Sequence, residues 1–356
     1  MPVTPSTSGK IVHTGSYTPD TGGEGIGLAA LRLDPASGVL TDDTGLPDVP
    51  VSGPSFLVAH PSGNVVYSTN EAEAGAVSAF ARRRNGALEP LSPPLASGGA
   101  NPCHLAVHPE GRWLLTANYG TDTAPGTVAV HRLDDDGRPV ELVDVVVHEG
   151  SGPVAGRQAG SHAHQVVVDP SGRFVLAVDL GADTVFGYRL DSVTGTLTQV
   201  VANQLRTGSG PRHLAFSPEG NQVWITDELS SRVTGLRYDS RTATLTETSS
   251  IRATARQGHN QPGAVIASPC GRYVWVSNRG ADTVAAFRVC DASLQLIAET
   301  PSGGRWPRGL ELVDGRLLVA NERSGTVAVL RVLDGGALEN ATTVVTVPSV
   351  VCTLTL

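Results

Sequence analysis

The sequence predicts an all-β fold, a seven-bladed β-propeller with four antiparallel strands in each blade. One observation is a Pro-x-Gly turn that recurs at Pro61, Pro109, Pro170, Pro218 and Pro269, with Asp314-Gly315 in place of a sixth copy. The spacings of 48, 61, 48, 51 and 45 residues are close to the length of a propeller blade. The other observation is the content of 41 glycines and 24 prolines in 356 residues, which favours many short strands over long helices.

Each copy of the repeat has the same order of strands. A short apolar strand precedes the turn (FLVAH, HLAVH, QVVVD, HLAFS, AVIAS, LELVD), and a second follows it (VVYSTN, WLLTAN, FVLAVD, VWITD, YVWVSN, LLVAN). A polar turn leads to a third strand, such as TVAVHRL or TVFGYRL, and a weaker fourth strand follows, such as TLTQVV. The almost continuously apolar second strands indicate burial between neighbouring blades. Alternation in the third strands indicates one packed and one solvated face.

The two ends of the chain together supply the seventh blade in this prediction. Near the N-terminus, IVHTGSYT, GLAALRLD and GVLTD match the second, third and fourth strands, and VPSVVCTLTL at the C-terminus matches the missing first strand. Closure by both ends removes an open sheet edge that would otherwise invite aggregation. We therefore assign residues 1–10 to an N-terminal tail and residues 11–356 to a single propeller domain.

One interval of the repeat is longer than the others. The 61-residue spacing places about a dozen extra residues between Asn118 and Ser161, some in GTDTAPG and the rest in the Gly-rich HEGSGPVAGRQAGSH. Long loops on rigid scaffolds often carry function. A tolerated surface insertion explains the extra residues equally well.

Charge and composition exclude several classes of function. The formal net charge of −8 argues against a general nucleic-acid binder. The N-terminus lacks the apolar core of a signal peptide and no apolar run reaches membrane-span length, so we expect a cytoplasmic protein without a membrane partner. The sequence indicates no particular protein partner. Reduced and mostly buried thiols are expected for the four cysteines, Cys103, Cys270, Cys290 and Cys352, which show no CxxC pairing.

Propeller geometry limits which side chains can meet. The first strand of each blade lines the central channel and the second runs antiparallel to it, so first-strand starts and second-strand ends lie at one mouth. First-strand starts place His104, His162, His164, Arg212, His213 and Arg308 there, and second-strand ends place Glu71, Asn118, Tyr119, Asp179, Glu228, Asn278, Arg279 and Glu322. So many ionisable and amide groups at equivalent places indicate a pocket for a polar, anionic ligand.

The histidine pair at this mouth has three possible roles. His162 and His164 are two residues apart on a strand, so they share one face. They could be catalytic or ligand-binding, they could be structural, or they could form a metal pair. A metal needs further ligands, and no third His or Cys is obviously placed, so we predict no metal.

The charged residues of the mouth suggest acid–base and anion chemistry. Arg212 follows Gly210-Pro211 and could hold a phosphate or carboxylate with two N–H groups, or could form an ion pair between blades. Glu228 is a candidate general base, with a salt bridge to Arg212 or Arg279 as its structural alternative. The candidate substrate-binding residues are His162, His213, His104, Asn118, Asn278 and Arg308, although asparagines at strand ends more often cap turns.

The common catalytic motifs are absent from the sequence. It contains no Gly-rich phosphate loop before a helix, no GxSxG and no HExxH. These absences exclude the common nucleotide-binding, serine-hydrolase and zincin classes at the level of motifs.

The pieces GSHAHQVVVDP, GPRHLAFSPEG, DEL, SNRGADTVAAF and WPR occur in this order, and with them the chain resembles the lactonase family of seven-bladed propellers. This family includes the propeller-type 6-phosphogluconolactonases and the fungal carboxymuconate lactonising enzymes. The resemblance implies a site of His164, Arg212, Glu228 and Arg279, with His162 as a further candidate.

The resemblance also implies a reaction. That reaction is hydrolysis of a small anionic sugar lactone without a cofactor, above all 6-phospho-D-glucono-1,5-lactone to 6-phosphogluconate, a step of the pentose phosphate pathway. Glu228 or His164 would activate water, and Arg212 and Arg279 would bind the anion and stabilise the oxyanion. Lactonisation of a muconate-type dicarboxylate and a non-catalytic propeller that binds a ligand or protein stay open as alternatives.

Overall fold

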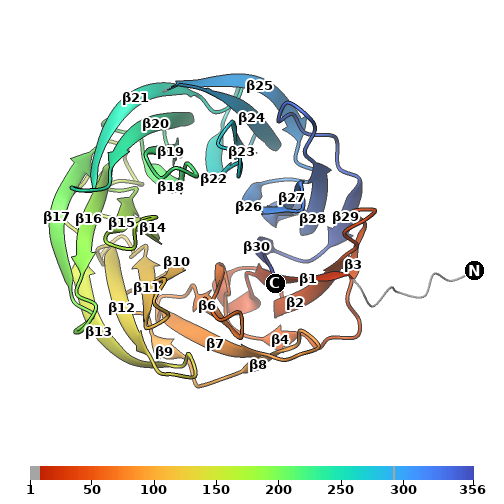
Figure 1. The fold of residues 1–356 in the computed structure, drawn as a ribbon, viewed down its shortest axis with the longest axis horizontal. Coiled ribbons are helices and arrows are strands. Elements are labelled where there is room, and N and C mark those ends of the chain that lie inside the picture. The colour runs from red at the N-terminus through yellow and green to blue at the C-terminus, as the bar shows by residue number, and fades with distance from the viewer. Residues whose placement is uncertain (1–8, 292) are drawn as a thin grey trace, which may run out of the picture.

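The computed structural model describes residues 9–291 and 293–356, which form seven antiparallel sheets arranged as a ring around a central channel (Figure 1). This confirms the predicted seven-bladed, all-β propeller with four strands per blade. The described residues contain just two helical turns, η1 (Pro19–Thr21) and η2 (Glu322–Ser324), both of the 3-10 type. Residues 1–8, in the predicted tail, lie outside the described residues, and the first strand begins at Lys10.

The blades are numbered here in chain order. Blade 1 contains β1 (Lys10–Ser16), β2 (Gly27–Leu33), β3 (Leu40–Asp42), β4 (Val49–Pro50) and β30 (Val350–Thr355). Blade 2 contains β5 (Leu57–Ala59), β6 (Val65–Asn70), β7 (Ala76–Arg82), β8 (Leu88–Pro90) and β9 (Leu95–Ala96). Blade 3 contains β10 (Pro102–Val107), β11 (Trp113–Asn118), β12 (Thr127–Leu133) and β13 (Pro139–Val147). Blade 4 contains β14 (Ala163–Val168), β15 (Val175–Asp179), β16 (Thr184–Leu190) and β17 (Leu197–Gln204).

The last three blades follow the same pattern. Blade 5 contains β18 (Pro211–Phe216), β19 (Gln222–Asp227), β20 (Arg232–Asp239) and β21 (Thr244–Arg252). Blade 6 contains β22 (Gln261–Ala267), β23 (Tyr273–Arg279), β24 (Thr283–Cys290) and β25 (Ser293–Pro301). Blade 7 contains β26 (Pro307–Val313), β27 (Arg316–Asn321), β28 (Thr326–Arg331) and β29 (Thr343–Thr346). In Figure 1 the strands nearest the channel include β10, β14, β18, β22 and β26 and, in blade 1, β30.

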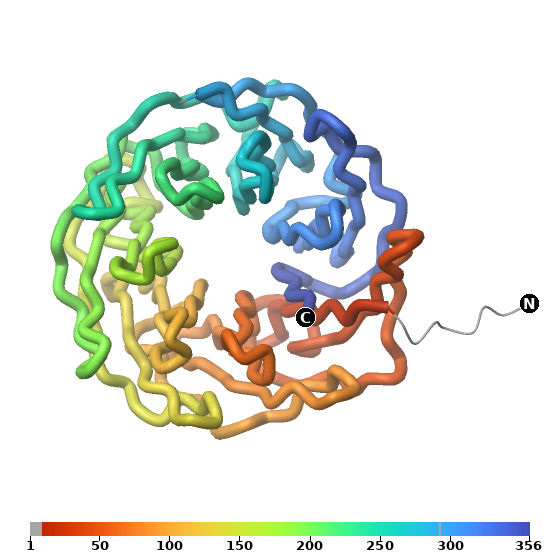
Figure 2. The backbone as a smooth tube through the Cα atoms, viewed as in Figure 1, coloured from red at the N-terminus to blue at the C-terminus, as the bar shows by residue number. Residues whose placement is uncertain are grey.

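Blade 1 is closed by both ends of the chain, as predicted. Strand β30 pairs antiparallel with β1, with Val12 opposite Thr355 and Gly15 opposite Cys352. Figure 2 shows the blue C-terminal segment beside the red N-terminal strand at the inner edge of the ring. Val350 and Val351 are buried, so the last strand also contributes to the hydrophobic core.

The outer strands of blades 1 and 2 are split into two short pieces. Strands β3 and β4 both pair with β2, and strands β8 and β9 both pair with β7. Pro47 lies between the first two pieces, and Pro93 and Pro94 lie between the second two. Proline has no N–H to donate to the ladder, which explains why pairing stops at these places.

The sequence predicted that the third strand of each blade has one packed and one solvated face, and for β12 and β16 this was wrong. The second strands are buried along almost their whole length, as expected, for example β6 and β11. The third strands β12 and β16 are also buried on both faces over their first five residues, with one exposed position near the end of each. The sheets of neighbouring blades cover both faces of these strands. Solvated positions instead gather on the fourth strands, such as β13 and β21.

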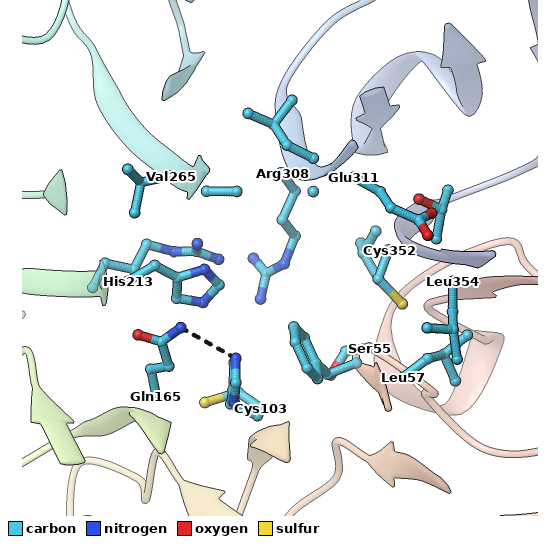
Figure 3. A pocket seen from close by; sticks show the side chains of 18 residues that line it. Ser55, Leu57, Cys103, Gln165, His213, Val265, Arg308, Glu311, Cys352 and Leu354 are labelled. Carbon is cyan, nitrogen blue, oxygen red and sulfur yellow. Dashed lines mark hydrogen bonds between the residues drawn. The ribbon is translucent and has the colours of Figure 1, made fainter. Parts of the chain in front are cut away.

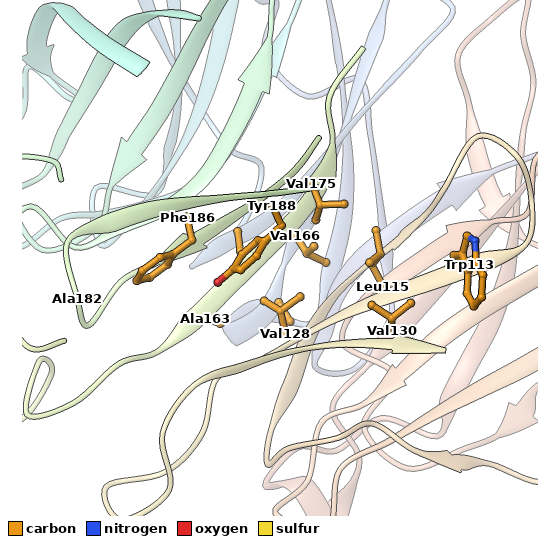
Figure 4. Packing of buried hydrophobic residues seen from close by; sticks show 12 residues of the cluster. Trp113, Leu115, Val128, Val130, Ala163, Val166, Val175, Ala182, Phe186 and Tyr188 are labelled. Atoms are coloured by element: carbon orange, nitrogen blue, oxygen red, sulfur yellow. The ribbon is translucent and has the colours of Figure 1, made fainter. Parts of the chain in front are cut away.

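The hydrophobic core lies between neighbouring blades. In Figure 4, Trp113, Leu115, Val128 and Val130 of blade 3 face Val166, Val175, Phe186 and Tyr188 of blade 4. Six further interfaces are built in the same manner. Since each blade buries both faces against its neighbours, the ring holds every inner strand in a fixed place.

The repeated turn has one geometry around the ring. The glycine of the turn has φ between 69° and 72° in all six copies, including Gly315 in the Asp-Gly copy. In the five Pro-x-Gly copies its N–H donates to the carbonyl three residues earlier. This left-handed conformation explains why glycine occupies the position each time.

All four cysteines are free thiols, as expected. Only Cys103 and Cys352 are buried, so the expectation of mostly buried thiols holds for half of them. In the part of the chain that the structure describes, no helix has the length and apolar character needed to cross a membrane.

Candidate active site

Two sets of equivalent positions build one mouth of the channel. One set lies at the end of the second strand of each blade or directly after it, and consists of Tyr17, Glu71, Tyr119, Leu180, Glu228, Arg279 and Glu322. The other set lies at β-bulges at the starts of inner strands, where Cys103, His164, Arg212, His213 and Arg308 fall between paired residues. Bulges re-aim side chains and are frequent beside active sites. The register therefore turns these side chains toward the channel.

Glu228 is the centre of a buried cluster of charges. Its Oε1 lies 2.5 Å from Nη2 of Arg157, and its Oε2 lies 2.5 Å from Nη2 of Arg279 and 3.3 Å from Nε of Arg212. The burial of Glu228 would raise its pKa, but Arg279, Arg212 and Arg157 together hold that pKa below its ordinary value. The cluster is therefore a carboxylate among three guanidinium groups and carries an excess of positive charge.

Arg279 uses most of its donors inside the protein. Its Nε donates to the carbonyl of Gln261 at 3.1 Å, and its Nη2 donates to Glu228 and to the carbonyl of Pro262. The guanidinium also lies 5.7 Å from the centre of the Trp306 ring. This arginine is thus held in one orientation at the edge of the site.

Arg212 is different, because its donors are unused. Its side chain is 2% exposed, and its Nε and Nη1 have no hydrogen-bond partner among residues 9–291 and 293–356. Burial, with Arg279 and Arg308 nearby, lowers the pKa of Arg212 to about 9, so the group is charged at neutral pH. Glu228 is thus within ion-pair distance of this guanidinium without forming a hydrogen bond to it, and the unused N–H groups could still donate to an anionic ligand.

A cavity of about 210 Å³ lies in the channel beside this arginine. Arg212, His213 and Arg308 belong to its wall, and Figure 3 shows the labelled His213 and Arg308 pointing into it. Glu228 and Arg279 are not part of this wall and lie at the ends of second strands, at the mouth. The cavity therefore reaches from the charged cluster into the channel.

Three buried histidines contact one another next to Arg212. The His213 ring lies 5.2 Å from the His164 ring and 5.4 Å from the His104 ring. Nδ1 of His104, Nδ1 of His164 and Nε2 of His213 are buried without a partner in the described part of the chain. Burial and the charge of Arg212 hold the pKa of all three below the ordinary value, to about 3 for His104. They are therefore neutral imidazoles at neutral pH.

Gln165, which the sequence did not single out, fixes part of this group. Its amide nitrogen lies 3.3 Å from Nε2 of His104, the dashed line in Figure 3. Its Oε1 accepts from the backbone N–H of Leu214 at 2.6 Å. This side chain therefore joins the inner strands of blades 3, 4 and 5.

His162 lies at the rim, next to Tyr119. Their rings stack at 4.3 Å, and Nδ1 of His162 lies 2.9 Å from the carbonyl oxygen of Tyr119. His164 meets the same tyrosine edge-on at 5.8 Å, so both histidines face Tyr119. Asp179 holds this corner, because it accepts from the N–H of His162 and pairs with His148.

The described ranges contain no group of three His, Cys, Asp or Glu side chains arranged to hold a metal ion. The metal-pair interpretation of His162 and His164 therefore receives no support from the geometry.

Two of the predicted substrate-binding residues lie away from the cluster. Asn118 is fully buried and donates to the carbonyl of Ser97 and to Oγ1 of Thr127. Asn278 is equally buried and donates to the carbonyl of Ala253. Both amides tie strand ends to neighbouring loops, which is the capping role weighed above.

Arg157 is a member of the charged cluster that the sequence did not identify. It comes from the Gly-rich insertion, and its side chain is about one-third exposed. Next to it, Gln158 is fully buried and donates to the carbonyl of Leu180 and to Asp183. The one signal in the sequence that pointed toward Arg157 was the long interval between the repeats. It marked the loop, but it did not indicate which residue of the loop reaches the site.

Arg308 lies in a second charged group at the mouth. It is 3.8 Å from Oε1 of Glu71 and 3.7 Å from Oε2 of Glu322. The hydroxyl of Tyr17 donates to Glu71 at 2.9 Å, and the Arg308 guanidinium lies 5.3 Å from the Tyr17 ring. This group has one more carboxylate than guanidinium groups and so is acidic.

The fold and the site together define a β-propeller with a cationic, partly buried pocket at one mouth of its channel. Such a pocket can bind an anion at Arg212. Next to it, in contact with His213 of the pocket wall, lies the neutral imidazole of His164, a group that can accept a proton.

Comparison with known proteins then gives the family. The family model "Lactonase, 7-bladed beta-propeller" matches residues 11–355, so the chain belongs to the lactonase family of seven-bladed β-propellers. The 6-phosphogluconolactonase of Bacillus subtilis (strain 168) is 31% identical over 96% of this chain and 97% of its own length.

Solved structures with the same fold superpose on nearly the whole chain. The periplasmic gluconolactonase PpgL of Pseudomonas aeruginosa superposes with a TM-score of 0.91 at 28% identity, covering 98% of this chain and 99% of that one. A protein from Lactobacillus plantarum gives a TM-score of 0.88 at 29% identity over 98% of this chain and 99% of its own.

Proposed function

We propose that the protein hydrolyses a sugar lactone, and that 6-phospho-D-glucono-1,5-lactone, which gives 6-phosphogluconate, is its substrate. The observation that carries this proposal is the nearly fully buried Arg212 guanidinium, whose Nε and Nη1 make no hydrogen bond with any described residue although Glu228 lies 3.3 Å from Nε. An anionic group or a developing oxyanion satisfies these donors. The family and the two relatives named for lactone hydrolysis support the same reaction.

His164 is the general base in this proposal. Its unprotonated ring nitrogen takes a proton from water while the water oxygen bonds to C1 of the lactone, and the carbonyl electron pair moves onto the carbonyl oxygen. Arg212 stabilises this oxyanion. When the bond between C1 and the ring oxygen breaks, His164 returns the proton to that oxygen, and the product is an open-chain hydroxy acid.

Glu228 is the poorer base of the two candidates. Arg157 and Arg279 both donate to its carboxylate, and its low pKa means that it binds a proton weakly. In this proposal it acts as a positioning residue that holds these two arginines at the edge of the site.

The charge of the mouth argues against the muconate alternative. A dicarboxylate that placed one carboxylate at Arg212 would place the other toward the acidic group of Glu71 and Glu322. The second carboxylate and these glutamates would carry like charges and repel each other. A sugar lactone with one anionic group avoids this conflict.

The test is a comparison of two arginine variants. Arg212→Gln replaces the guanidinium by a shorter, uncharged amide, and we expect kcat/KM for 6-phosphogluconolactone to fall roughly 10²- to 10³-fold, as for other lost oxyanion donors. Arg206→Gln, an exposed arginine paired with Glu247, is the matched control and should stay within about twofold.

The rate is measured as loss of the lactone above spontaneous hydrolysis in buffer. Wild-type protein that gives no acceleration contradicts the proposal and favours a non-catalytic binding propeller. Full activity in Arg212→Gln contradicts the role of the arginine. Activity kept in His164→Asn but lost in Glu228→Gln would move the base to the carboxylate.

A further inference from the structure

The mouth of the channel has two charged arms on opposite sides of the ring. The first arm, called here the cationic arm, consists of Arg157, His164, Arg212, Glu228 and Arg279 from blades 4, 5 and 6. The second, called the acidic arm, consists of Tyr17, Glu71, Arg308 and Glu322 from blades 1, 2 and 7. In Figure 1 these two sets of three blades face each other across the channel. A ligand in the mouth therefore meets both arms.

The acidic arm is loosely paired, unlike the cationic arm. The separations of 3.8 and 3.7 Å between Arg308 and its two glutamates are too long for hydrogen bonds, whereas Arg279 approaches Glu228 to 2.5 Å. Oε2 of Glu71 and Oε2 of Glu322 are buried and accept no hydrogen bond from any described residue. Because buried polar atoms are normally hydrogen-bonded, these two carboxylate oxygens can accept hydrogen bonds from a ligand that carries donor groups.

We propose that the acidic arm is a hydroxyl-binding subsite for the polyol part of the lactone, and that it sets selectivity for hydroxylated lactones. A hydroxyl group donates one hydrogen bond and accepts others, so it fits between a carboxylate and a guanidinium. The hydroxyl of Tyr17 holds Oε1 of Glu71 and leaves Oε2 free for the ligand. The proposal rests on the proposed function, because it concerns the same mouth.

The chemistry of a 1,5-lactone fits these two arms in one orientation. In the six-membered ring, the carbonyl carbon C1 and the C5 atom that bears C6 are on either side of the ring oxygen. The carbonyl and a phosphate on C6 thus belong to one half of the ring, and the hydroxyls on C2, C3 and C4 belong to the other half. The first half suits the donors of Arg212, and the second suits the acceptors of Glu71 and Glu322.

Selectivity between two lactones tests the subsite. Glucono-1,5-lactone carries the hydroxyls, and δ-valerolactone is the same ring without them. We expect Glu71→Gln and Glu322→Gln each to lower the ratio of kcat/KM for the first lactone over the second by at least about tenfold, because each weakens a charged acceptor. A change that merely loosened the fold would lower both values together and leave the ratio unchanged, and that outcome would overturn the proposal.

The matched control is Glu89→Gln. Glu89 lies in the same blade as Glu71, on the outer strand β8, is exposed, and pairs with Arg83 in the turn after β7. It should leave the ratio within about twofold of wild type. An equal change of the ratio in Glu89→Gln also counts against the subsite.

A binding experiment separates failure of the subsite from failure of the proposed function. D-Gluconate and hexanoate have the same carboxylate and the same number of carbons, but gluconate alone carries hydroxyls. The subsite predicts that gluconate binds at least about tenfold more tightly by calorimetry, and that Glu71→Gln with Glu322→Gln removes most of this difference. Equal affinities in the wild type overturn the subsite even if lactones are hydrolysed. A preference for gluconate upholds it even if no lactone is hydrolysed.

Discussion

Two side chains of the mouth are held in states that isolated residues do not prefer. Arg212 is almost fully buried and lacks partners in the described ranges for two of its N–H positions, a condition that costs about 1–3 kcal/mol for each unsatisfied group. His164 is buried beside this charge and stays neutral. Such costs are typical of functional sites, where the ligand supplies the missing partner.

The state of His164 predicts a pH dependence. Burial and the charge of Arg212 hold the pKa of His164 well below its ordinary value of 6.5, and a base acts only when it is deprotonated. As pH falls, kcat/KM for glucono-1,5-lactone should stay level through pH 6.5 and decline only at more acidic values. This neutral lactone is used because it has no phosphate that titrates in the same range.

The measurement is kcat/KM from pH 4.5 to 7.5, corrected for spontaneous hydrolysis. A decline centred at pH 6.5 or above would contradict the assignment of His164 as base. His164→Asn should lose most of the rate and the acidic limb with it. His259→Asn, which changes an exposed histidine, should keep the wild-type profile.

At the scale of elements, one repeated irregularity and one insertion build the site. The bulges at the starts of the inner strands add residues that have no opposite partner, and these include His164 and Arg212. The insertion between β13 and β14 brings Arg157 back to Glu228 in blade 5. A regular blade would supply neither the extra side chains nor the third arginine.

Gln158 anchors this insertion, and its loss should release Arg157. Its amide is fully buried and donates to the carbonyl of Leu180 and to Asp183. Without these bonds, which together contribute about 2–4 kcal/mol, the loop should open more often. We expect trypsin to cut Gln158→Ala after Arg157 at least about tenfold faster than the wild type, as followed by mass spectrometry.

The control for this experiment is Gln199→Ala, which changes an exposed glutamine on an outer strand. Its cleavage after Arg157 should match the wild type. Equal protection of the 157–158 bond in Gln158→Ala would show that other contacts hold the loop. In Gln158→Ala, kcat/KM for the lactone should fall while the thermal midpoint changes by only a few degrees.

At the scale of the whole molecule, the ring is closed by one short strand. Strand β30 is the inner strand of blade 1, and it packs against β26 of blade 7 through buried valines such as Val350. The acidic arm of the mouth depends directly on this closure, since Tyr17 follows β1 in the same blade. Stability and the site are thus coupled through the ring.

Deletion of residues 347–356 should therefore destabilise the entire propeller. It removes the inner strand of blade 1 and exposes an unpaired sheet edge on β1. We expect the thermal midpoint to fall by more than about 10 °C, or the protein to aggregate, since more than one large buried side chain is lost. An unchanged midpoint would count against closure by this strand.

A synthetic peptide of residues 347–356 serves as the check on this interpretation. Added in excess, it should raise the thermal midpoint of the truncated protein, because it binds the folded ring and not the unfolded chain. A peptide with Val350 and Val351 replaced by aspartate should not, since both positions are buried.

The sequence was sufficient for the fold and for placing the main candidate site residues at one mouth of the channel. The repeated turns and strands are local patterns, and their number and order lead directly to a closed ring of seven blades. Because every blade repeats the same register, strand starts and strand ends share one mouth, which is why His164, Arg212, Glu228 and Arg279 could be brought together from their positions alone. The same reasoning placed Arg308 at the mouth.

The tertiary structure decided what depends on contacts between distant segments. Arg157 meets Glu228 across 71 residues, and no repeat pattern encodes where an irregular loop ends. The donors of Arg279 are satisfied and those of Arg212 are not, a difference that depends on carbonyls and side chains of other blades. Asn118 and Asn278 occupy equivalent strand ends, yet both turn toward neighbouring loops. The sequence pattern placed these residues around the channel, and three-dimensional packing determined which of them keep free hydrogen-bonding groups for a ligand.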